Sequence, residues 1–167
     1  MQRKNSVARG ITNASAFKIG IVVSAYYADE ITEKLLTGAL EVLQEAQVLQ
    51  KNIAVLRVPG CFEIPYGCLK LLTRKGKQLD AIITLGCVIK GETDHNVYIA
   101  TAVTEGVMRL MLEFETPIAF GIITANNLAQ AKARTVGEKN KGYEAALAAL
   151  GSLFAGNEHT TLKVGRG

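Results

Sequence analysis

The segment Ala81–Ile89 constrains the fold of this chain more than any other feature. An almost unbroken apolar run of this length is typical of a strand buried on both faces, as the strands of parallel sheets are. A polar turn, Lys90–His95, follows at once and holds a glycine, two acids, a threonine and a histidine. In open α/β sheets, ligands bind beyond the carboxyl ends of the strands. The sequence therefore predicts a buried parallel strand that leads directly into a functional site.

Strand patterns and helix patterns alternate along the rest of the chain. We predict strands at residues 17–23, 53–58, 81–89 and 118–124, and helices at residues 31–46, 64–75, 95–114, 127–135 and 141–154. Asp29 lies where it can cap the first helix or stabilise its dipole. Right-handed crossovers between such units give a parallel sheet with helices on both faces. We therefore expect one α/β domain, a three-layer α/β/α sandwich with a four-stranded parallel sheet.

The expected domain covers residues 14–156. Residues 1–13 are polar and lack apolar periodicity, so they are expected to form an extended or disordered arm, and residues 157–167 form a polar tail. Four strands make a narrow sheet with two edges to protect, and the last helices are rich in alanine. We therefore expect neighbouring subunits to cover part of this one, and the arm is a candidate for addition to a neighbour.

Charge and cysteine content exclude several classes of protein. The formal net charge is +4, of which Arg3, Lys4 and Arg9 contribute three charges, so the body of the chain has no nucleic-acid footprint. Three cysteines without a Cys-x-x-Cys pair argue against a disulfide framework or a structural zinc site and favour a reducing compartment. No apolar run is long enough to span a bilayer, and the start lacks the apolar core of a signal peptide. We expect a cytoplasmic protein that binds neither membrane nor nucleic acid.

Side chains suited to proton transfer and anion binding follow the predicted strands. His95 can exchange protons near neutral pH, and with no second histidine nearby a metal role is not expected. The turn before it can present backbone N–H groups and a hydroxyl to an anion, or simply cap the next helix. Glu63 can cap a helix start or bind hydroxyl groups, and Arg134 can compensate a helix dipole or bind an anion. The residues alone leave these alternatives open.

Four segments together resemble the lumazine synthase family, in order and near the family's spacing. They are Val-Pro-Gly-Cys-Phe-Glu-Ile-Pro at 58–65, Leu-Gly-Cys-Val-Ile-Lys-Gly-Glu-Thr-Asp-His at 85–95, Pro-Ile-Ala-Phe-Gly-Ile-Ile-Thr at 117–124 and Asn-Lys-Gly-Tyr-Glu-Ala-Ala-Leu at 140–147. The resemblance implies a flavodoxin-like fold and a transferase of riboflavin biosynthesis. The implied reaction condenses 5-amino-6-(D-ribitylamino)uracil with 3,4-dihydroxy-2-butanone 4-phosphate to give 6,7-dimethyl-8-ribityllumazine, phosphate and water. It implies no metal and no organic cofactor.

The resemblance also assigns site residues by position. His95 and Arg134 are implied to be catalytic, the first by moving protons and the second by gripping phosphate. The remaining implied substrate-binding residues are Gly91, Glu92 and Thr93 around the phosphate, then Tyr26 or Tyr27, Cys61, Phe62, Glu63, Cys87, Val88 and Ile89 around the pyrimidine and ribityl chain, with Phe120 from an adjacent subunit and Lys141 of the Asn-Lys-Gly motif. The implied partners are copies of the same chain, as a pentamer or a sixty-subunit assembly of pentamers, and riboflavin synthase.

Three departures from the family pattern leave points open. The first loop is one residue longer than usual, so either Tyr26 or Tyr27 can stack on the pyrimidine. Asp94 replaces a small or hydroxyl residue beside the histidine, where a carboxylate favours the charged imidazole or repels phosphate. The run from Arg134 to Gly142 is one residue shorter than the common form, which leaves the capsid open. An archaeal-type riboflavin synthase and a non-enzymatic shell or flavin-binding subunit are the alternative functions.

Overall fold

The structure is a computed structural model that describes residues 13–76 and 78–157. The predicted arm over residues 1–13 and the predicted tail over residues 157–167 lie outside these ranges, except for Asn13 and Asn157.

The described part of the chain is built around a parallel sheet of four strands. These are β1 (Ile19–Ser24), β2 (Ile53–Val58), β3 (Ala81–Ile89) and β4 (Ile118–Ala125), in the spatial order β2-β1-β3-β4. Strand β3 is buried along almost its whole length because β1 and β4 pair with its two sides and helices cover both faces. The central strand expected from the apolar run is confirmed, with the predicted boundaries.

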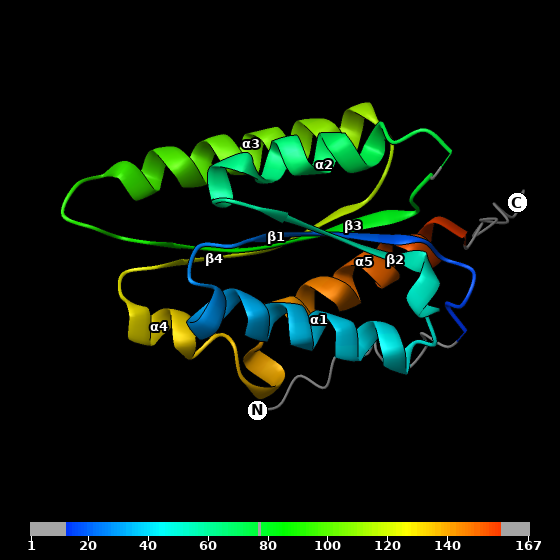
Figure 1. Ribbon diagram of the computed structural model, residues 1–167, viewed down its shortest axis with the longest axis horizontal. Coiled ribbons are helices and arrows are strands. Elements are labelled where there is room, and N and C mark those ends of the chain that lie inside the picture. Colours follow the sequence, from blue (N-terminus) through cyan, green and yellow to red (C-terminus); the bar gives the residue numbers. More distant parts are fainter. Residues whose placement is uncertain (1–12, 77, 158–167) are drawn as a thin grey trace, which may run out of the picture.

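Helices cover both faces of the sheet, as predicted (Figure 1). They are α1 (Glu33–Glu45), α2 (Ile64–Leu72), α3 (His95–Glu113), α4 (Leu128–Lys132) and α5 (Lys141–Asn157), with short helical turns η2 (Ala28–Thr32), η3 (Gln50–Asn52), η4 (Cys61–Glu63) and η5 (Gly137–Lys139). Helices α2 and α3 lie on one face, and α1, α4 and α5 lie on the other. The three-layer α/β/α sandwich is therefore confirmed, and its strand order is that of flavodoxin-like folds with one strand fewer.

Several helix ends differ from the predicted ones for local reasons. Helix α2 ends at Leu72, before the predicted 75, because Thr73 leaves the helical conformation (φ −91°, ψ 3°) and the N–H of Arg74 turns to the carbonyl of Leu71 at 3.5 Å. Asp29 does not cap α1 through its side chain. The chain enters that helix through the π-helical turn η2, whose N-terminal flank is Tyr27 in a left-handed conformation (φ 58°). Prediction by periodicity missed this turn because π turns carry no distinct apolar spacing.

The two faces of the sheet hold separate apolar cores, since side chains alternate along each strand. Ile21 and Ile83 point to the core under α1 and α5, whereas Val22 and Ile82 point to the core under α2 and α3. None of the helices within the described ranges is both long and apolar enough to cross a bilayer.

Candidate active site

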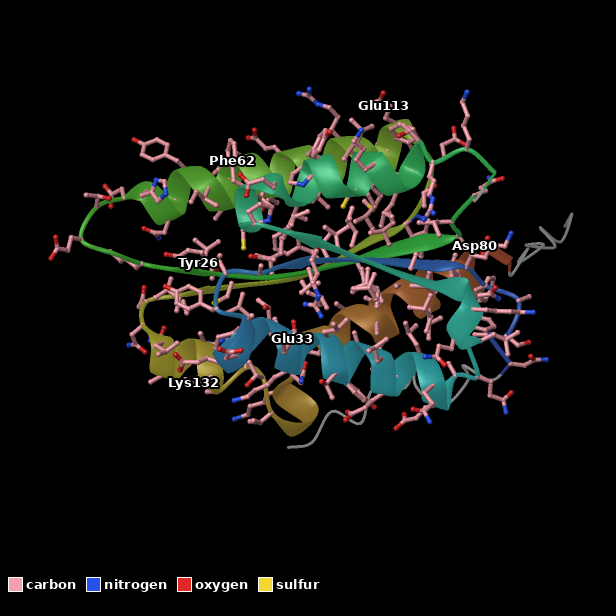
Figure 2. All side chains as sticks on the ribbon, viewed as in Figure 1. Tyr26, Glu33, Phe62, Asp80, Glu113 and Lys132 are labelled. Atoms are coloured by element: carbon pink, nitrogen blue, oxygen red, sulfur yellow. The ribbon has the colours of Figure 1, made fainter. Side chains whose placement is uncertain are left out.

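The carboxyl ends of the four strands lie at one edge of the sheet, at the left in Figure 1. The segments that follow the strands touch one another there. Turn η2 contacts β3 and α4, and turn η4 contacts β3 and α3. Tyr26 and Phe62 lie toward this side in Figure 2, whereas Asp80 and Glu113 lie at the opposite side. Most residues predicted for the site are therefore brought to one edge.

The two tyrosines after β1 have different surroundings. Tyr26 is 64% exposed, and its backbone N–H bonds the hydroxyl of Ser24 at 3.2 Å. Tyr27 is half-buried and packs against the core, and burial raises the pKa of its phenol, with smaller contributions from Tyr26, Cys87 and Glu30. The two rings meet edge to face, with centroids 5.0 Å apart. One ring is thus available to a ligand, and the other supports it.

The segment after β2 is organised by Glu63. One carboxylate oxygen of Glu63 accepts a hydrogen bond from the backbone N–H of Gly60 at 2.9 Å, which closes a capping arrangement at the start of η4. The capping alternative for this residue is therefore observed. Because a carboxylate has several acceptor positions, capping leaves capacity for a hydroxyl ligand. Phe62 beside it is 61% exposed.

Two thiols lie where β2 and β3 end. Cys61 is buried, and its Sγ lies 3.4 Å from the backbone carbonyl of Cys87, to which it donates. Burial raises the pKa of Cys61 to about 11 and that of Cys87 to about 12. These buried side chains are therefore neutral thiols at physiological pH and are not suited to nucleophilic attack.

The turn after β3 is hydrogen-bonded to β4 at its first residue, and the residues that follow are exposed to solvent. The N–H of Lys90 bonds the carbonyl of Ala125 at 2.8 Å, which extends the pairing of β3 with β4 by one residue. Residues 91–95 are all exposed. His95 is the first residue of α3, which is 19 residues long. The unpaired N–H groups at the start of such a helix, together with the hydroxyl of Thr93, are suited to an anion.

Arg134 lies just beyond α4, on a segment anchored to α5. Its guanidinium donates to the carbonyl of Gln130 at 2.7 Å, and its own carbonyl accepts from the N–H of Lys141 at 2.9 Å. The Lys141 ammonium in turn pairs with Glu144 at 2.5 Å. Arg134 is exposed, so donors of its planar fork remain free for a phosphate.

Phe120 is not brought to this edge. It lies within β4, in register with Thr84 and five residues before the end of the strand at Ala125. Five residues of strand span about 16 Å. The side chain is 43% exposed on the face of α2 and α3, beside Ile118 and Ile122 of the same face. Within one chain, Phe120 is therefore remote from His95.

Other contacts at this edge carried no assigned role in the sequence. An ion pair joins Lys132 of α4 to Glu30 of η2, so it links the tyrosine loop to the segment that carries Arg134. The side chain of Asn140 binds four backbone groups around that segment. An asparagine directly before an apolar helix is a cap signal and could have been noted.

The described residues include no group of three or more His, Cys, Asp or Glu side chains that could hold a metal ion. The edge instead combines one imidazole, one exposed arginine, a helix start, an exposed aromatic ring and carboxylates. Fold and site together define a flavodoxin-like α/β protein whose carboxyl sheet edge carries groups suited to an anionic ligand and to a planar ligand.

Comparison with known proteins identifies the family. The sequence model of 6,7-dimethyl-8-ribityllumazine synthase matches residues 16–155. Relatives of that name include one from Parabacteroides distasonis, 43% identical over 84% of this chain and 86% of its own length. Another from Cytophaga hutchinsonii is 45% identical over 86% of this chain and 89% of its own length. The chain belongs to the 6,7-dimethyl-8-ribityllumazine synthase family, transferases of riboflavin biosynthesis, and the resemblance inferred from the four motifs is confirmed.

Proposed function

We propose that this chain condenses 5-amino-6-(D-ribitylamino)uracil with 3,4-dihydroxy-2-butanone 4-phosphate to give 6,7-dimethyl-8-ribityllumazine, with release of phosphate and water. The observation that carries the proposal is the convergence of the segments that hold Tyr26, Glu63, His95 and Arg134 at one edge of the sheet. Joining two substrates depends above all on holding them in contact, and this edge offers two different kinds of binding surface.

The butanone phosphate is assigned to the turn after β3 and to Arg134. Gly91, Glu92 and Thr93 provide the backbone and hydroxyl donors, and Arg134 provides charge-assisted hydrogen bonds to the phosphate. His95 lies at the start of the same helix and is exposed, so it can pass protons during imine formation and phosphate loss. Lys141 is assigned to the same anionic end through its position next to the Arg134 carbonyl.

The pyrimidine is assigned to the exposed ring of Tyr26, with Tyr27 as its support. The difference in exposure between the two tyrosines favours this choice over the reverse. The backbone of Cys87, Val88 and Ile89 is assigned to the pyrimidine edge. The ribityl hydroxyls are assigned to Glu63, with Cys61 and Phe62 alongside.

The site is proposed to be completed by a second copy of the chain, in a homopentamer. Phe120 is 43% exposed and remote from its own chain's edge, which supports its assignment to a neighbour's site. Large apolar side chains also stay exposed on α3, among them Tyr98 at 75% and Leu112 at 69%. Native mass measurement tests the pentamer and distinguishes it from a capsid or a complex with riboflavin synthase. Three free, buried thiols suit a reducing compartment such as the cytoplasm.

The function is tested by supplying purified protein with both substrates and following lumazine absorbance. We expect product well above the uncatalysed rate, a decrease in kcat of about a hundredfold in His95→Ala, and an unchanged native mass in that variant. Arg134→Ala is expected to raise the KM for butanone phosphate and to leave the KM for the pyrimidine near its original value. Binding of both substrates without product would instead identify a non-enzymatic subunit. Turnover of lumazine alone would identify a riboflavin synthase.

A further inference from the structure

Asn140 lies directly before α5 and is buried, with 7% of its surface exposed. Its side chain makes every hydrogen bond that an amide can make with two donor hydrogens and two acceptor positions. The amide nitrogen donates to the carbonyls of Lys34 at 3.0 Å and Thr135 at 2.9 Å. The amide oxygen accepts from the N–H groups of Gly142 at 2.8 Å and Tyr143 at 3.2 Å. One side chain thus joins three segments: α1, the stretch after α4, and the start of α5.

The stretch after α4 is the one that carries Arg134. Asn140 holds the carbonyl of Thr135, the next residue, and the N–H of Lys141 holds the carbonyl of Arg134 itself. Thr135 is buried, whereas Arg134 is exposed. The backbone at Arg134 and Thr135 is therefore hydrogen-bonded to the start of α5, and Asn140 also connects it to α1.

The space around Asn140 is closed on the side of α1. A Cβ atom at Gly38 would lie 2.6–2.7 Å from three side-chain atoms of Asn140, closer than real Cβ contacts. A Cβ at Gly142 would lie 1.9 Å from the carbonyl oxygen of Leu35. Glycine at these two positions lets α1 and α5 approach closely enough for one short amide to bridge them.

We propose that Asn140 is a positioning residue for the phosphate site: it fixes the backbone from which Arg134 reaches the butanone phosphate. This inference rests on the proposed phosphate-binding role of Arg134. Asn140 does not touch the substrate. Its two amide hydrogens are what the role requires, because a carboxylate or hydroxyl in its place keeps the helix cap but cannot donate to both carbonyls.

Three variants separate this role from general destabilisation. Asn140→Asp keeps the shape and the cap but sets an oxygen against the carbonyls of Lys34 and Thr135. Asn140→Ser keeps a capping hydroxyl, buries no charge and is too short to reach both carbonyls, so it serves if the aspartate variant fails to fold. Gly38→Ala keeps the asparagine at position 140, but its new methyl group displaces the Asn140 side chain. The matched control is Leu150→Ala, which removes a fully buried side chain of α5 far from the Asn140 hydrogen bonds.

The measurements are the KM of each substrate, kcat, and the inhibition constant of inorganic phosphate. We expect Asn140→Asp, Asn140→Ser and Gly38→Ala to raise the KM for butanone phosphate and the phosphate inhibition constant together, by about tenfold for the aspartate variant. In these variants the KM for the pyrimidine should stay within about twofold of the wild-type value. Leu150→Ala should change neither the KM for butanone phosphate nor the phosphate inhibition constant.

An unchanged phosphate inhibition constant in a folded Asn140 variant would overturn the positioning role, as would an equal rise in Leu150→Ala. The proposed function fails separately, when the wild-type protein makes no product from the two substrates, and the proposed role of Arg134 fails when Arg134→Ala leaves the phosphate inhibition constant unchanged. If the phosphate inhibition constant rises in Arg134→Ala but not in the Asn140 variants, only the proposed role of Asn140 is contradicted.

Discussion

The two helical layers of this protein differ in how far a single chain completes them. On the side of α1 and α5, the helices approach closely, and the side chain of Asn140 bridges them by hydrogen bonds. On the side of α2 and α3, Val103 and Val107 are the buried residues of α3, although that helix has 19 residues. The first layer is packed against its own chain, whereas the outer surface of the second is left apolar and uncovered. We therefore expect α1 and α5 to support the proposed site of their own chain, and α3 to take part in the proposed association between chains.

The largest expected effect is on the free energy of unfolding, and it compares a glycine substitution in one helical layer with one in the other. Gly142→Ala places a methyl group against the backbone of Leu35, so we expect a loss of about 4 kcal/mol or more in the free energy of unfolding, or no soluble protein. Gly106→Ala in α3 meets Pro65 at 3.0 Å and gains helix propensity, so we expect a change of less than about 1 kcal/mol. Denaturant titration of both variants measures the difference. Equal losses would show that the two layers are packed alike.

The second prediction tests the uncovered layer. Leu112 is 69% exposed in the chain alone, so Leu112→Glu should cost the folded subunit little. A carboxylate buried at a contact between chains should weaken association at least about a hundredfold, near 3 kcal/mol. Native mass spectrometry across a dilution series measures the change, with Glu113→Gln on the same helix as the control. Retention of the full native mass by Leu112→Glu would remove α3 from the interface.

The third prediction concerns the interior beneath the uncovered layer. Cys68 of α2 is fully buried, and burial raises its thiol pKa to about 12. In the unfolded chain the same thiol loses its proton near pH 8.5. Between these values the folded state binds more protons, so its stability is complete at lower pH and falls as the pH rises above about 9.

The slope of the free energy of unfolding against pH measures how well water is excluded from Cys68. We expect the free energy of unfolding of the wild type to fall more steeply with pH than that of Cys68→Ala, by up to about 1.4 kcal/mol per pH unit. Urea unfolding at fixed protein concentration, from about pH 8 to about pH 10.5, measures both slopes. Parallel slopes would mean that water reaches Cys68 from the uncovered side.

The smallest expected effect lies at the rim of the closed layer. Arg57 of the edge strand β2 pairs with Glu33 at the start of α1, and both side chains are largely exposed. Exposed ion pairs contribute little because water and salt screen them. Arg57→Gln should therefore change the free energy of unfolding by less than about 1 kcal/mol, and thermal denaturation in low and high salt measures it. A larger loss would mean that rim charges, and not the Gly142 contact, hold this layer.

Much of the fold could be predicted because it is encoded in local patterns. The boundaries of β2 and β3 coincide with the apolar runs, and α3 begins at His95 as expected. Val103 and Val107 of this helix face the sheet and are buried in the core beneath it. Periodicity could not locate the end of α2, because apolar spacing does not report where Thr73 leaves the helical conformation.

The candidate site divides in the same way. The positions of His95 and Arg134 followed from motifs at strand and helix ends, and their catalytic roles remain predictions. The choice between Tyr26 and Tyr27 could not be made from the sequence, since the extra residue of this loop shifts the count by one. In the folded chain, the carbonyl of Tyr27 accepts from the N–H of Ile31 at 2.9 Å and of Thr32 at 3.1 Å, so a π turn absorbs the longer loop.

By itself, the sequence determined the order of strands and helices, the parallel sheet and the family, because apolar periodicity and contiguous motifs are properties of neighbouring residues. Tertiary structure alone decided which tyrosine is exposed and that Asn140 bridges three segments. Each of these depends on burial or on the exact approach of backbone groups brought together by folding. The hydrogen bond from Asn140 to Lys34 joins residues 106 positions apart, and no local pattern encodes such a contact.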